Sequence, residues 1–433
     1  MWNPNARSTP VDPARVLISG LALLGLLALA PAAALADDWP DWRGPNRDGL
    51  CKETGLLDRW PEEGPPLQWH VTGLGRGFST VAVSQGRVFT TGKRSDGVYL
   101  VALDETTGRK LWEQRFATQG GANSTPVVDG DRVYALATQG DLVCCSVRDG
   151  RVLWQKSFPG DFGGKMMSGW GYSETPLVDG EKLVCTPGGP QAGMVALDKL
   201  TGQVIWRSRI PGGGKRGRDG AGYSSIVISH GAGVKQYVQL MGRGVAGVRA
   251  SDGHFLWGYN RVANGTANIP TPIVAGDYVF CSSGYGTGAA LLRLRRVGRE
   301  GVRAEEVYFL PAKTFQNHHG GMVLVGRYLY AGHGHNQGFP ICLDLRTGRR
   351  MWFAGRGPGS GSAAVLYADG HLYFKYQNGV IALIEANPRR YRLKSHFRMP
   401  TKDNRNWAHP VIANGRLYLR SLGELFCHDV RKQ

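Results

Sequence analysis

Short apolar runs recur along the chain in pairs. In most pairs, the two runs are joined by a short polar stretch that contains glycine. Residues 81–89 read Val-Ala-Val-Ser-Gln-Gly-Arg-Val-Phe, and residues 126–134 read Pro-Val-Val-Asp-Gly-Asp-Arg-Val-Tyr. Similar pairs return at residues 176–184, 226–238, 272–280, 322–330, 364–373 and 410–418. Alternating apolar residues around Asp-Gly or Asn-Gly are a strong hairpin signal. Each pair therefore predicts two antiparallel strands.

A second phrase follows most of these pairs, in which three residues separate a turn glycine from a tryptophan. It occurs at Gly108 and Trp112, Gly150 and Trp154, Gly202 and Trp206, Gly253 and Trp257, and Gly348 and Trp352. The tryptophans lie about 42, 52, 51 and 95 residues apart, and the last interval predicts an intervening unit in which residues 307–309 replace the tryptophan strand. We expect each indole to pack on the neighbouring unit and to donate its N–H to a backbone carbonyl.

Together the two phrases predict four strands in every 40–50 residues, which is the blade of a β-propeller. The last unit, residues 410–430, stops before its fourth strand. Residues 67–71 carry Trp69 and resemble a fourth strand, but no first three strands precede them. If this N-terminal strand completes the last blade, no sheet edge is left open in the ring. The sequence predicts an all-β fold, an eight-bladed β-propeller of four-stranded antiparallel blades whose last blade is closed by the N-terminal strand.

The first residues have the character of an export signal. Arg7 and Arg15 precede or flank an apolar run at residues 16–30, and Ala34-Leu35-Ala36 offers a cleavage site. We expect residues 1–36 to be a signal peptide that is removed, with an uncleaved anchor as the alternative. Residues 37–66 are expected to pack on the propeller outside the blades, and residues 67–433 to form the propeller. The protein should be periplasmic or secreted, monomeric, and without a membrane span after cleavage.

Composition supports this picture and narrows the partners. Glycine is abundant at 63 residues, and the net charge is +18. We interpret the charge as a solvated basic exterior and expect no nucleic-acid partner, because export separates the protein from nucleic acid. The chain has seven cysteines, which include the adjacent Cys144 and Cys145. We expect this pair to be ordinary strand residues, and no cysteine spacing matches a haem or zinc site.

Residues 101–112 and 195–206 share the phrase Val-Ala-Leu-Asp-x-x-Thr-Gly-x-x-Leu/Ile-Trp. This phrase resembles the tryptophan-docking repeat of quinoprotein dehydrogenases, which use pyrroloquinoline quinone (PQQ), and of the non-catalytic assembly protein BamB. Residues 39–49 also resemble the start of exported PQQ-like propellers of planctomycete-type bacteria. The resemblance covers the chain from about residue 67 onward. It implies a PQQ-like propeller, and it leaves open whether PQQ with calcium is bound.

The loops that link the last strand of one blade to the first strand of the next should ring the mouth of the central channel. We name these the inter-blade loops, and they cover residues 75–80, 120–125, 170–175, 220–225, 264–271, 317–321, 357–362 and 404–409. The candidate site residues that they carry are Asn123, Trp170, Tyr172, Glu174, Tyr223, Asn268, His318, His319, Trp407 and His409. Aromatic residues with a few polar groups suit a small-ligand site. The alternative is that these side chains fill the channel and bond to one another.

A group of histidines is predicted in the sixth blade. His318 and His319 lie in its inter-blade loop, and His333 and His335 lie in a second loop on the same face. Neutral imidazoles from two loops can hold a metal ion. A polar cluster without metal is the alternative.

Three functions remain open from the sequence. The first is a binding or scaffold protein of the periplasm or cell envelope, BamB-like in fold, with a protein partner or a small-molecule ligand at the channel mouth. The second is a PQQ-dependent oxidoreductase of alcohols or sugars, in which Glu174 is the base or a calcium ligand and Trp170 or Trp407 is the platform. The third is a metal-dependent, carbohydrate-directed protein that uses the four histidines.

Overall fold

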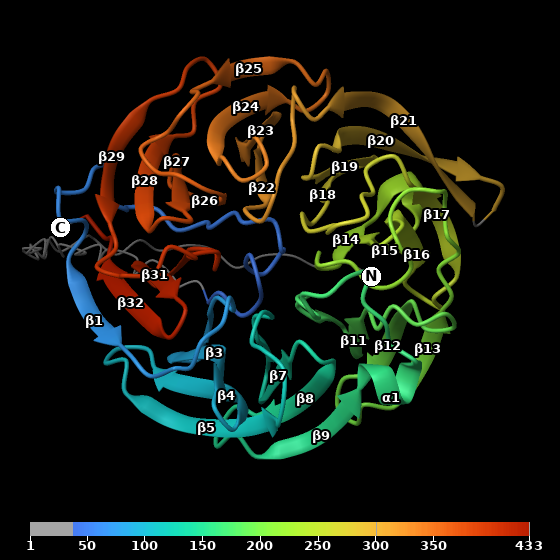
Figure 1. The fold of residues 1–433 in the computed structure, drawn as a ribbon, viewed down its shortest axis with the longest axis horizontal. Helices are drawn as coiled ribbons and strands as arrows, with labels where there is room; N and C mark the ends of the chain where they lie inside the picture. Colours follow the sequence, from blue (N-terminus) through green and yellow to red (C-terminus); the bar gives the residue numbers. More distant parts are fainter. Residues whose placement is uncertain (1–37, 300, 433) are drawn as a thin grey trace, which may run out of the picture. The chain divides into compact units, whose positions relative to one another are not determined.

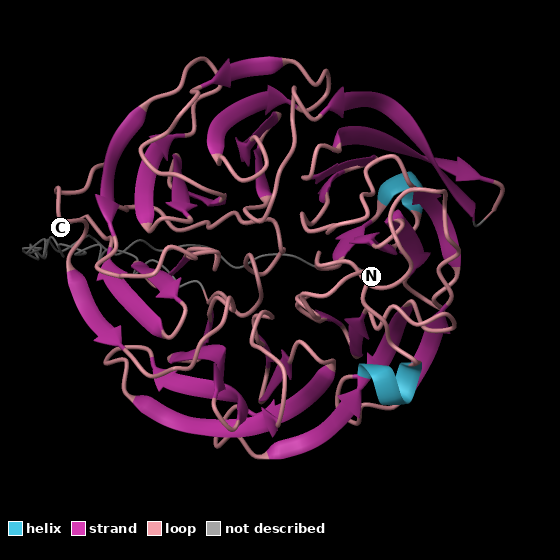
Figure 2. Cartoon of the chain, viewed as in Figure 1, coloured by secondary structure: helices cyan, strands magenta, loops and turns pink. Residues whose placement is uncertain are grey.

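The computed structural model describes residues 38–299 and 301–432, so the predicted signal peptide lies outside the described residues. Eight four-stranded antiparallel sheets stand around a central axis (Figures 1 and 2). Two short helices, α1 (Phe158–Phe162) and η1 (Gly231–Gly233), are the only helices among the described residues. The predicted eight-bladed propeller is confirmed.

The first four blades are formed in chain order from the innermost to the outermost strand. Blade one contains β2 (Ala82–Ser84), β3 (Arg87–Arg94), β4 (Gly97–Asp104) and β5 (Lys110–Ala117). Blade two contains β6 (Val127–Asp129), β7 (Arg132–Leu136), β8 (Asp141–Ser146) and β9 (Val152–Ser157). Blade three contains β10 (Leu177–Asp179), β11 (Lys182–Cys185), β12 (Met194–Asp198) and β13 (Val204–Ser208). Blade four contains β14 (Val227–Ser229), β15 (Gln236–Met241), β16 (Gly244–Arg249) and β17 (Phe255–Tyr259).

The remaining blades follow the same order, except the last. Blade five contains β18 (Ile273–Ala275), β19 (Tyr278–Ser283), β20 (Gly288–Val297) and β21 (Gly301–Pro311). Blade six contains β22 (Met322–Val325), β23 (Tyr328–His333), β24 (Phe339–Asp344) and β25 (Arg350–Phe353). Blade seven contains β26 (Ala363–Ala368), β27 (His371–Tyr376), β28 (Val380–Glu385) and β29 (Leu393–Arg398). Blade eight contains β30 (Val411–Ala413), β31 (Arg416–Ser421), β32 (Glu424–Asp429) and, as its outermost strand, β1 (Leu67–Val71).

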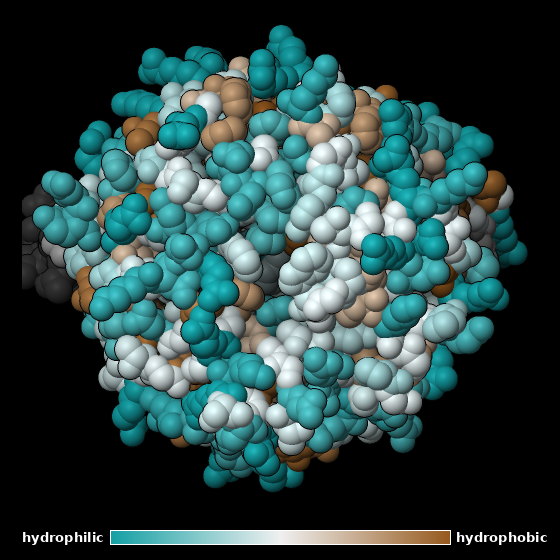
Figure 3. Space-filling model, in the orientation of Figure 1, coloured by the Kyte–Doolittle hydropathy of each residue, from teal (hydrophilic) through white to brown (hydrophobic). Residues whose placement is uncertain are grey.

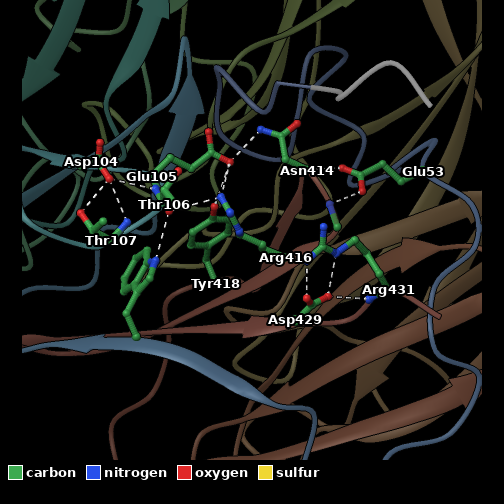
Figure 4. Close-up of polar contacts among 12 residues, drawn as sticks. Glu53, Asp104, Glu105, Thr106, Thr107, Asn414, Arg416, Tyr418, Asp429 and Arg431 are labelled. Carbon is green, nitrogen blue, oxygen red and sulfur yellow. Dashed lines mark hydrogen bonds and ion pairs between the residues drawn. The ribbon is translucent and has the colours of Figure 1, made fainter. Parts of the chain in front are cut away.

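The ring closes as the sequence predicted, because β1 pairs antiparallel with β32. Side chains reinforce the junction between blades eight and one. The buried carboxylate of Glu105 accepts hydrogen bonds from Asn414 Nδ2 at 2.8 Å, Arg416 Nη1 at 3.2 Å and Tyr418 OH at 3.2 Å (Figure 4). The two ends of the propeller chain are thus joined by a sheet ladder and by a buried ionic contact.

The tryptophans on the outermost strands join neighbouring blades. Trp112 Nε1 of blade one donates to the carbonyl oxygen of Val147 in blade two at 3.0 Å, and Trp154 and Trp352 make equivalent bonds to Lys199 and Asn387. In blade five, Tyr308 takes this place and its hydroxyl donates to Leu345 O at 2.7 Å. The expected packing and hydrogen bond to a carbonyl of the next blade are confirmed at these junctions, where the ring closes the gap at the rim. The prediction of a carbonyl partner is wrong at two others. Trp257 Nε1 donates to the side chain of Gln236 in its own blade, and Trp206 Nε1 has no hydrogen-bond partner among the described residues.

Residues 38–51 lie inside the ring rather than on its surface. Trp39 pairs with Val83 of β2, and the side chain of Arg47 donates to Thr175 O at 2.6 Å and to Ile226 O at 3.0 Å. Further contacts reach Val128 of blade two, Met322 of blade six, Tyr367 of blade seven and Ile412 of blade eight. We call residues 38–51 the axial segment. Since it touches the innermost region of seven blades, it fills the axis of the propeller.

The hydrophobic core is divided between the blades, and the outside is polar. Most residues of the inner and middle strands are fully buried, including Cys144 and Cys145 in β8, as predicted for ordinary strand residues. Figure 3 shows hydrophilic residues over most of one face, with apolar residues in small separate patches. This distribution agrees with a solvated exterior around a set of blade cores.

Candidate functional site

A cavity of about 470 Å³ opens among the inter-blade loops, where the sequence placed the channel mouth. It is lined by Trp42, Phe78, Gly121, Asn123, Thr138, Trp170, Ser173, Tyr223, Ser225, Ala267, Ile269, Pro270, Thr271, Tyr285, His318, His319, Gly321, Asn336, Trp407 and His409. Its volume lies within the usual range of about 300–1,000 Å³ for small-ligand sites. We call it the mouth cavity.

Aromatic rings form much of the wall. Trp407 packs against Phe78 and His319, each with ring centroids 4.6 Å apart. Trp170 lies edge to face with Tyr223 at 6.0 Å, and 57% of its surface is exposed. Trp42 comes from the axial segment and packs against His409 at 5.5 Å. The axial segment therefore contributes a wall residue to the cavity in addition to filling the axis.

The structure brings together seven of the predicted site residues, which are Asn123, Trp170, Tyr223, His318, His319, Trp407 and His409. The sequence analysis missed Trp42 and Tyr285 as cavity residues. Trp42 belongs to residues 37–66, which were expected to pack outside the blades, and nothing in the sequence shows that residues 38–51 enter the ring. Tyr285 lies in the loop between β19 and β20, which corresponds to the loop between β23 and β24 that contains His335. The reasoning that placed His335 on this face could therefore also have placed Tyr285 there.

Glu174, Tyr172 and Asn268 do not line the mouth cavity. Glu174 is 2% exposed, and its carboxylate accepts from Thr186 N at 2.6 Å and from Gln239 Nε2 at 3.1 Å. Burial raises the pKa of Glu174. Since both oxygens are bonded to protein groups away from the cavity, this carboxylate braces β11 and β15 and is not presented to a ligand in this arrangement.

Tyr172 and Asn268 support the loops in a similar way. Tyr172 OH donates to Pro187 O at 2.7 Å, and Asn268 Nδ2 donates to Met241 O at 2.9 Å. Both side chains are buried. Polar groups that bond to backbone carbonyls fix the loop conformation, so these two residues position the wall of the cavity.

The four histidines of blade six do not point toward a common centre. His318 stacks on His319 with centroids 3.6 Å apart, and its two nitrogens contact Ser362 Oγ at 2.7 Å and Tyr285 OH at 3.1 Å. His335 lies 4.1 Å from His318, centroid to centroid. His333 accepts from Gln316 N at 3.2 Å through Nδ1. Within residues 38–299 and 301–432, no group of three or more His, Cys, Asp or Glu side chains is arranged to hold a metal ion. The geometry is that of a stacked polar cluster.

The imidazoles that line the cavity are uncharged near neutral pH. Burial lowers the pKa of His318 to about 2 and the pKa of His319 to about 3. Burial, followed by the charge of Arg43, lowers the pKa of His409 to about 3. Among the described residues that line the cavity, none is Asp, Glu, Lys or Arg. The wall therefore combines aromatic rings with neutral hydrogen-bonding groups and presents no formal charge.

This wall does not fit PQQ with calcium. PQQ is a planar quinone that carries carboxylates, which require cationic or strong hydrogen-bond partners when they are buried. Calcium takes oxygen ligands that include carboxylates. Of the described residues that face the cavity, none supplies a carboxylate or a cation, although Trp170 and Trp407 would offer flat surfaces.

Comparison with known proteins supports the repeat on which this fold is built. The model of the family described as outer membrane protein assembly factor BamB matches residues 62–157 and 95–354. The chain belongs to this family. One relative is the outer membrane protein assembly factor BamB of Kangiella koreensis, 30% identical over 145 residues, which are 30% of this chain and 32% of the relative. Another is the quinoprotein ethanol dehydrogenase of Pseudomonas aeruginosa, 28% identical over 143 residues, which are 30% of this chain and 22% of the relative.

Solved structures agree with the BamB-type propeller. The quinohemoprotein alcohol dehydrogenase of Comamonas testosteroni has a TM-score of 0.62 at 14% identity, and the likeness covers 92% of this chain and 81% of that one. A europium-containing methanol dehydrogenase has a TM-score of 0.61 at 11% identity, covering 88% of this chain and 89% of that one. At such low identity these structures show the fold alone.

The matched region spans about a third of the Kangiella relative, and 22% of a second BamB, from Shewanella oneidensis. Over the part of the chain that the structure describes, no helix has the length and apolar character needed to cross a membrane. The BamB relatives and the quinoprotein dehydrogenase share the repeat with this chain, so the assignment of function depends on the site.

Proposed function

We propose that this chain is a non-catalytic binding propeller of the cell envelope, and that it holds a small-molecule ligand in the mouth cavity. The observation that carries the proposal is a cavity of about 470 Å³ with an aromatic wall and no formal charge. Such a wall binds by packing and by neutral hydrogen bonds. Among the described residues, its lining carries no Asp or Glu, and burial lowers the pKa of His318, His319 and His409, which makes these imidazoles weak bases.

Membership of the BamB family supports a location in the cell envelope, where the relatives are described as outer membrane assembly factors. It also supports a protein partner there. The predicted signal peptide at residues 1–36 fits the same location. Scaffolding and ligand binding are compatible, because the outer strands and the mouth cavity are different surfaces of one ring.

The alternative is a PQQ-dependent oxidoreductase, which the similarity to a quinoprotein ethanol dehydrogenase favours. Trp170 and Trp407 would be the aromatic platform, and Glu174 would have to leave its contacts with Thr186 and Gln239 to act as a base. That movement would expose buried hydrogen-bonding groups, which is unfavourable. The binding propeller needs no such rearrangement.

The experiment uses the protein from residue 37 onward, incubated with PQQ and calcium chloride and then desalted. We expect no quinone absorbance to remain with the protein and no dye reduction with ethanol or glucose. Retention of PQQ together with dye reduction would replace the binding propeller with the oxidoreductase. In parallel, saturation-transfer NMR with indole, a small neutral aromatic probe, should give a signal that Trp407→Ala removes. No signal from any probe would contradict a ligand-binding cavity.

A further inference from the structure

We propose that the mouth cavity binds a neutral carbohydrate, with one pyranose ring packed on its aromatic wall. This inference rests on the proposed binding function and names the class of ligand. Three properties of the wall lead to it. The first two disfavour ionic ligands and hydrocarbons, and the third provides a surface on which a sugar ring can pack.

The first property is the absence of charge, which disfavours ionic ligands. Two buried basic side chains, Arg43 and Lys375, act on His409 of the wall. Both donate to backbone carbonyls, with Arg43 Nη2 2.9 Å from Asp48 O and Lys375 Nζ 2.8 Å from Asn406 O. Burial also lowers the pKa of Lys375 to about 7. Neither side chain lines the cavity. A carboxylate or an ammonium group would lose its water on entry without gaining a counter-ion, which is costly. The ligand should therefore be uncharged.

The second property is the number of neutral polar groups, which disfavours a hydrocarbon. The amides and hydroxyls that line the cavity are those of Asn123, Thr138, Ser173, Tyr223, Ser225, Thr271, Tyr285 and Asn336. Several of them also bond to protein groups, such as Asn123 to Trp170 O and Ser225 to Thr175 N. In contrast, His319 Nδ1 and Trp407 Nε1 are buried and have no hydrogen-bond partner within the described part of the chain. An apolar ligand would leave these two nitrogens unpaired. Hydroxyl groups can both donate and accept, so they suit this mixture.

His319 and Trp407 mark one end of the ligand. Their ring centroids are 4.6 Å apart, and both nitrogens are shielded from solvent. Sugar binding therefore requires the two rings to turn their nitrogens toward neighbouring hydroxyls of one sugar ring when the ligand enters. Trp407 Nε1 can only donate a hydrogen bond, whereas Nδ1 of a neutral imidazole donates or accepts according to its tautomer. A vicinal diol meets both requirements.

The third property is the exposed aromatic surface at the rim. Trp170 is 57% exposed and lies between Gly169 and Gly171, and its indole packs only on Tyr223 among the aromatic contacts of the described residues. An aromatic ring exposed at the rim of an aromatic-lined cavity offers a flat surface to a ligand. One face of a pyranose ring is lined by C–H groups and packs on an aromatic ring, while the hydroxyls at its edge remain free to bond.

The test is saturation-transfer NMR and calorimetry on the protein from residue 37 onward. The probes are methyl β-D-glucopyranoside, maltose and cellobiose, with glucuronate and glucosamine as charged analogues of similar shape and indole as the reference probe. We expect at least one neutral sugar to bind, and both charged analogues to bind at least ten-fold more weakly. Trp170→Ala and Trp407→Phe should each weaken the sugar at least five-fold. Phe353→Ala, which alters an exposed aromatic residue of β25, should leave sugar affinity unchanged.

The outcomes separate the inference from the proposed function. Binding of indole without binding of any neutral sugar overturns the carbohydrate inference and leaves the binding cavity intact. Tighter binding of glucuronate or glucosamine than of the neutral sugars also overturns it, as does sugar binding that is unaffected by both tryptophan substitutions. If neither indole nor any sugar binds, the proposed function fails together with the inference.

Discussion

The indole Nε1 of Trp69, in the N-terminal strand β1, donates a hydrogen bond to the backbone carbonyl of Glu105 in blade one at 3.1 Å. The same contact with the next blade is made by Trp112, Trp154 and Trp352, but here it joins the two ends of the propeller. The side chain of the same glutamate binds Asn414, Arg416 and Tyr418 of blade eight (Figure 4). Glu105 is therefore bonded on both sides of the closing junction.

Replacement of this acid should destabilise the ring more than replacement of a surface acid. We expect Glu105→Ala to lower the free energy of unfolding by about 1–3 kcal/mol, because the partly buried side chains of Asn414 and Arg416 and the buried Tyr418 hydroxyl lose their carboxylate partner. Glu113 is the matched control, since it pairs with Arg94 and Lys110 while 27% exposed, and Glu113→Ala should cost less than about 1 kcal/mol. Urea unfolding measures both, and equal losses would show that the closing contacts add no stability.

The docking of each outer tryptophan on a turn glycine can be tested by comparison of two glycines. Gly202 (φ +72°) and Gly130 (φ +56°) both have left-handed backbones. A Cβ at Gly202 would lie 2.9 Å from the ring of Trp154, whereas a Cβ at Gly130 would meet nothing within 4 Å. Gly130→Ala should cost about 1–2 kcal/mol from its backbone alone, and Gly202→Ala about 1–3 kcal/mol more from overpacking. Equal unfolding midpoints would contradict the docking role.

The axial segment should contribute strongly to stability through Arg47. This side chain is 3% exposed, bonds to carbonyls of blades three and four, and lies 3.3 Å from Asp41. We expect Arg47→Met to lower the free energy of unfolding by about 3–5 kcal/mol, because it leaves the buried carboxyl group of Asp41 and several backbone carbonyls without their hydrogen-bond donor. Arg109→Met in an exposed turn is the control and should change stability little. A small effect of Arg47→Met in thermal and urea unfolding would mean that the segment is only loosely held.

Acidification should destabilise the protein through the buried histidines. The folded-state pKa of His318 is about 2, whereas an unfolded histidine has a pKa of about 6.5. Between these values the unfolded chain binds more protons, so stability falls as the pH falls below about 6.5. From pH 7 to pH 5 the loss should be about 2 kcal/mol for this imidazole.

Asp41 has the opposite effect on stability. Burial raises its pKa to about 6, so the folded state binds its proton more readily and this group favours folding as the pH falls. The comparison of variants therefore isolates the histidine. His318→Asn should lose about 2 kcal/mol less than the wild type between pH 7 and pH 5, and His254→Asn, which alters an exposed turn histidine, should follow the wild type. Parallel pH profiles for the wild type and His318→Asn would show that His318 is protonated in the folded protein.

The repeat predicted which loops surround the candidate site. Which side chains of those loops face the cavity depends on the direction of each side chain, which the repeat does not determine. The inter-blade loops were placed correctly because strand order decides which loops share a face, and this brought Trp170, Trp407 and His409 to one cavity. Glu174 lies in the same loop as Trp170 yet points into the interior toward Thr186 and Gln239. Position in a loop does not determine which neighbours a side chain meets, so a catalytic interpretation of Glu174 could not be tested from the sequence.

The number of blades, their strands and the closure by β1 could all be inferred from the amino-acid sequence alone. These features follow from the alternation of apolar residues in strands and from the residue types in turns, and both are local properties of the sequence. Three features became visible only in the folded chain: residues 38–51 fill the axis, Trp42 lines the mouth cavity, and the histidines of blade six stack without facing a common centre. The third depends on the direction in which each side chain leaves its loop. The first two depend on contacts between residues hundreds of positions apart, such as Arg43 with Met322 and Cys51 with Ile412. No periodic pattern records such contacts, because they arise once, when the ring closes around the segment.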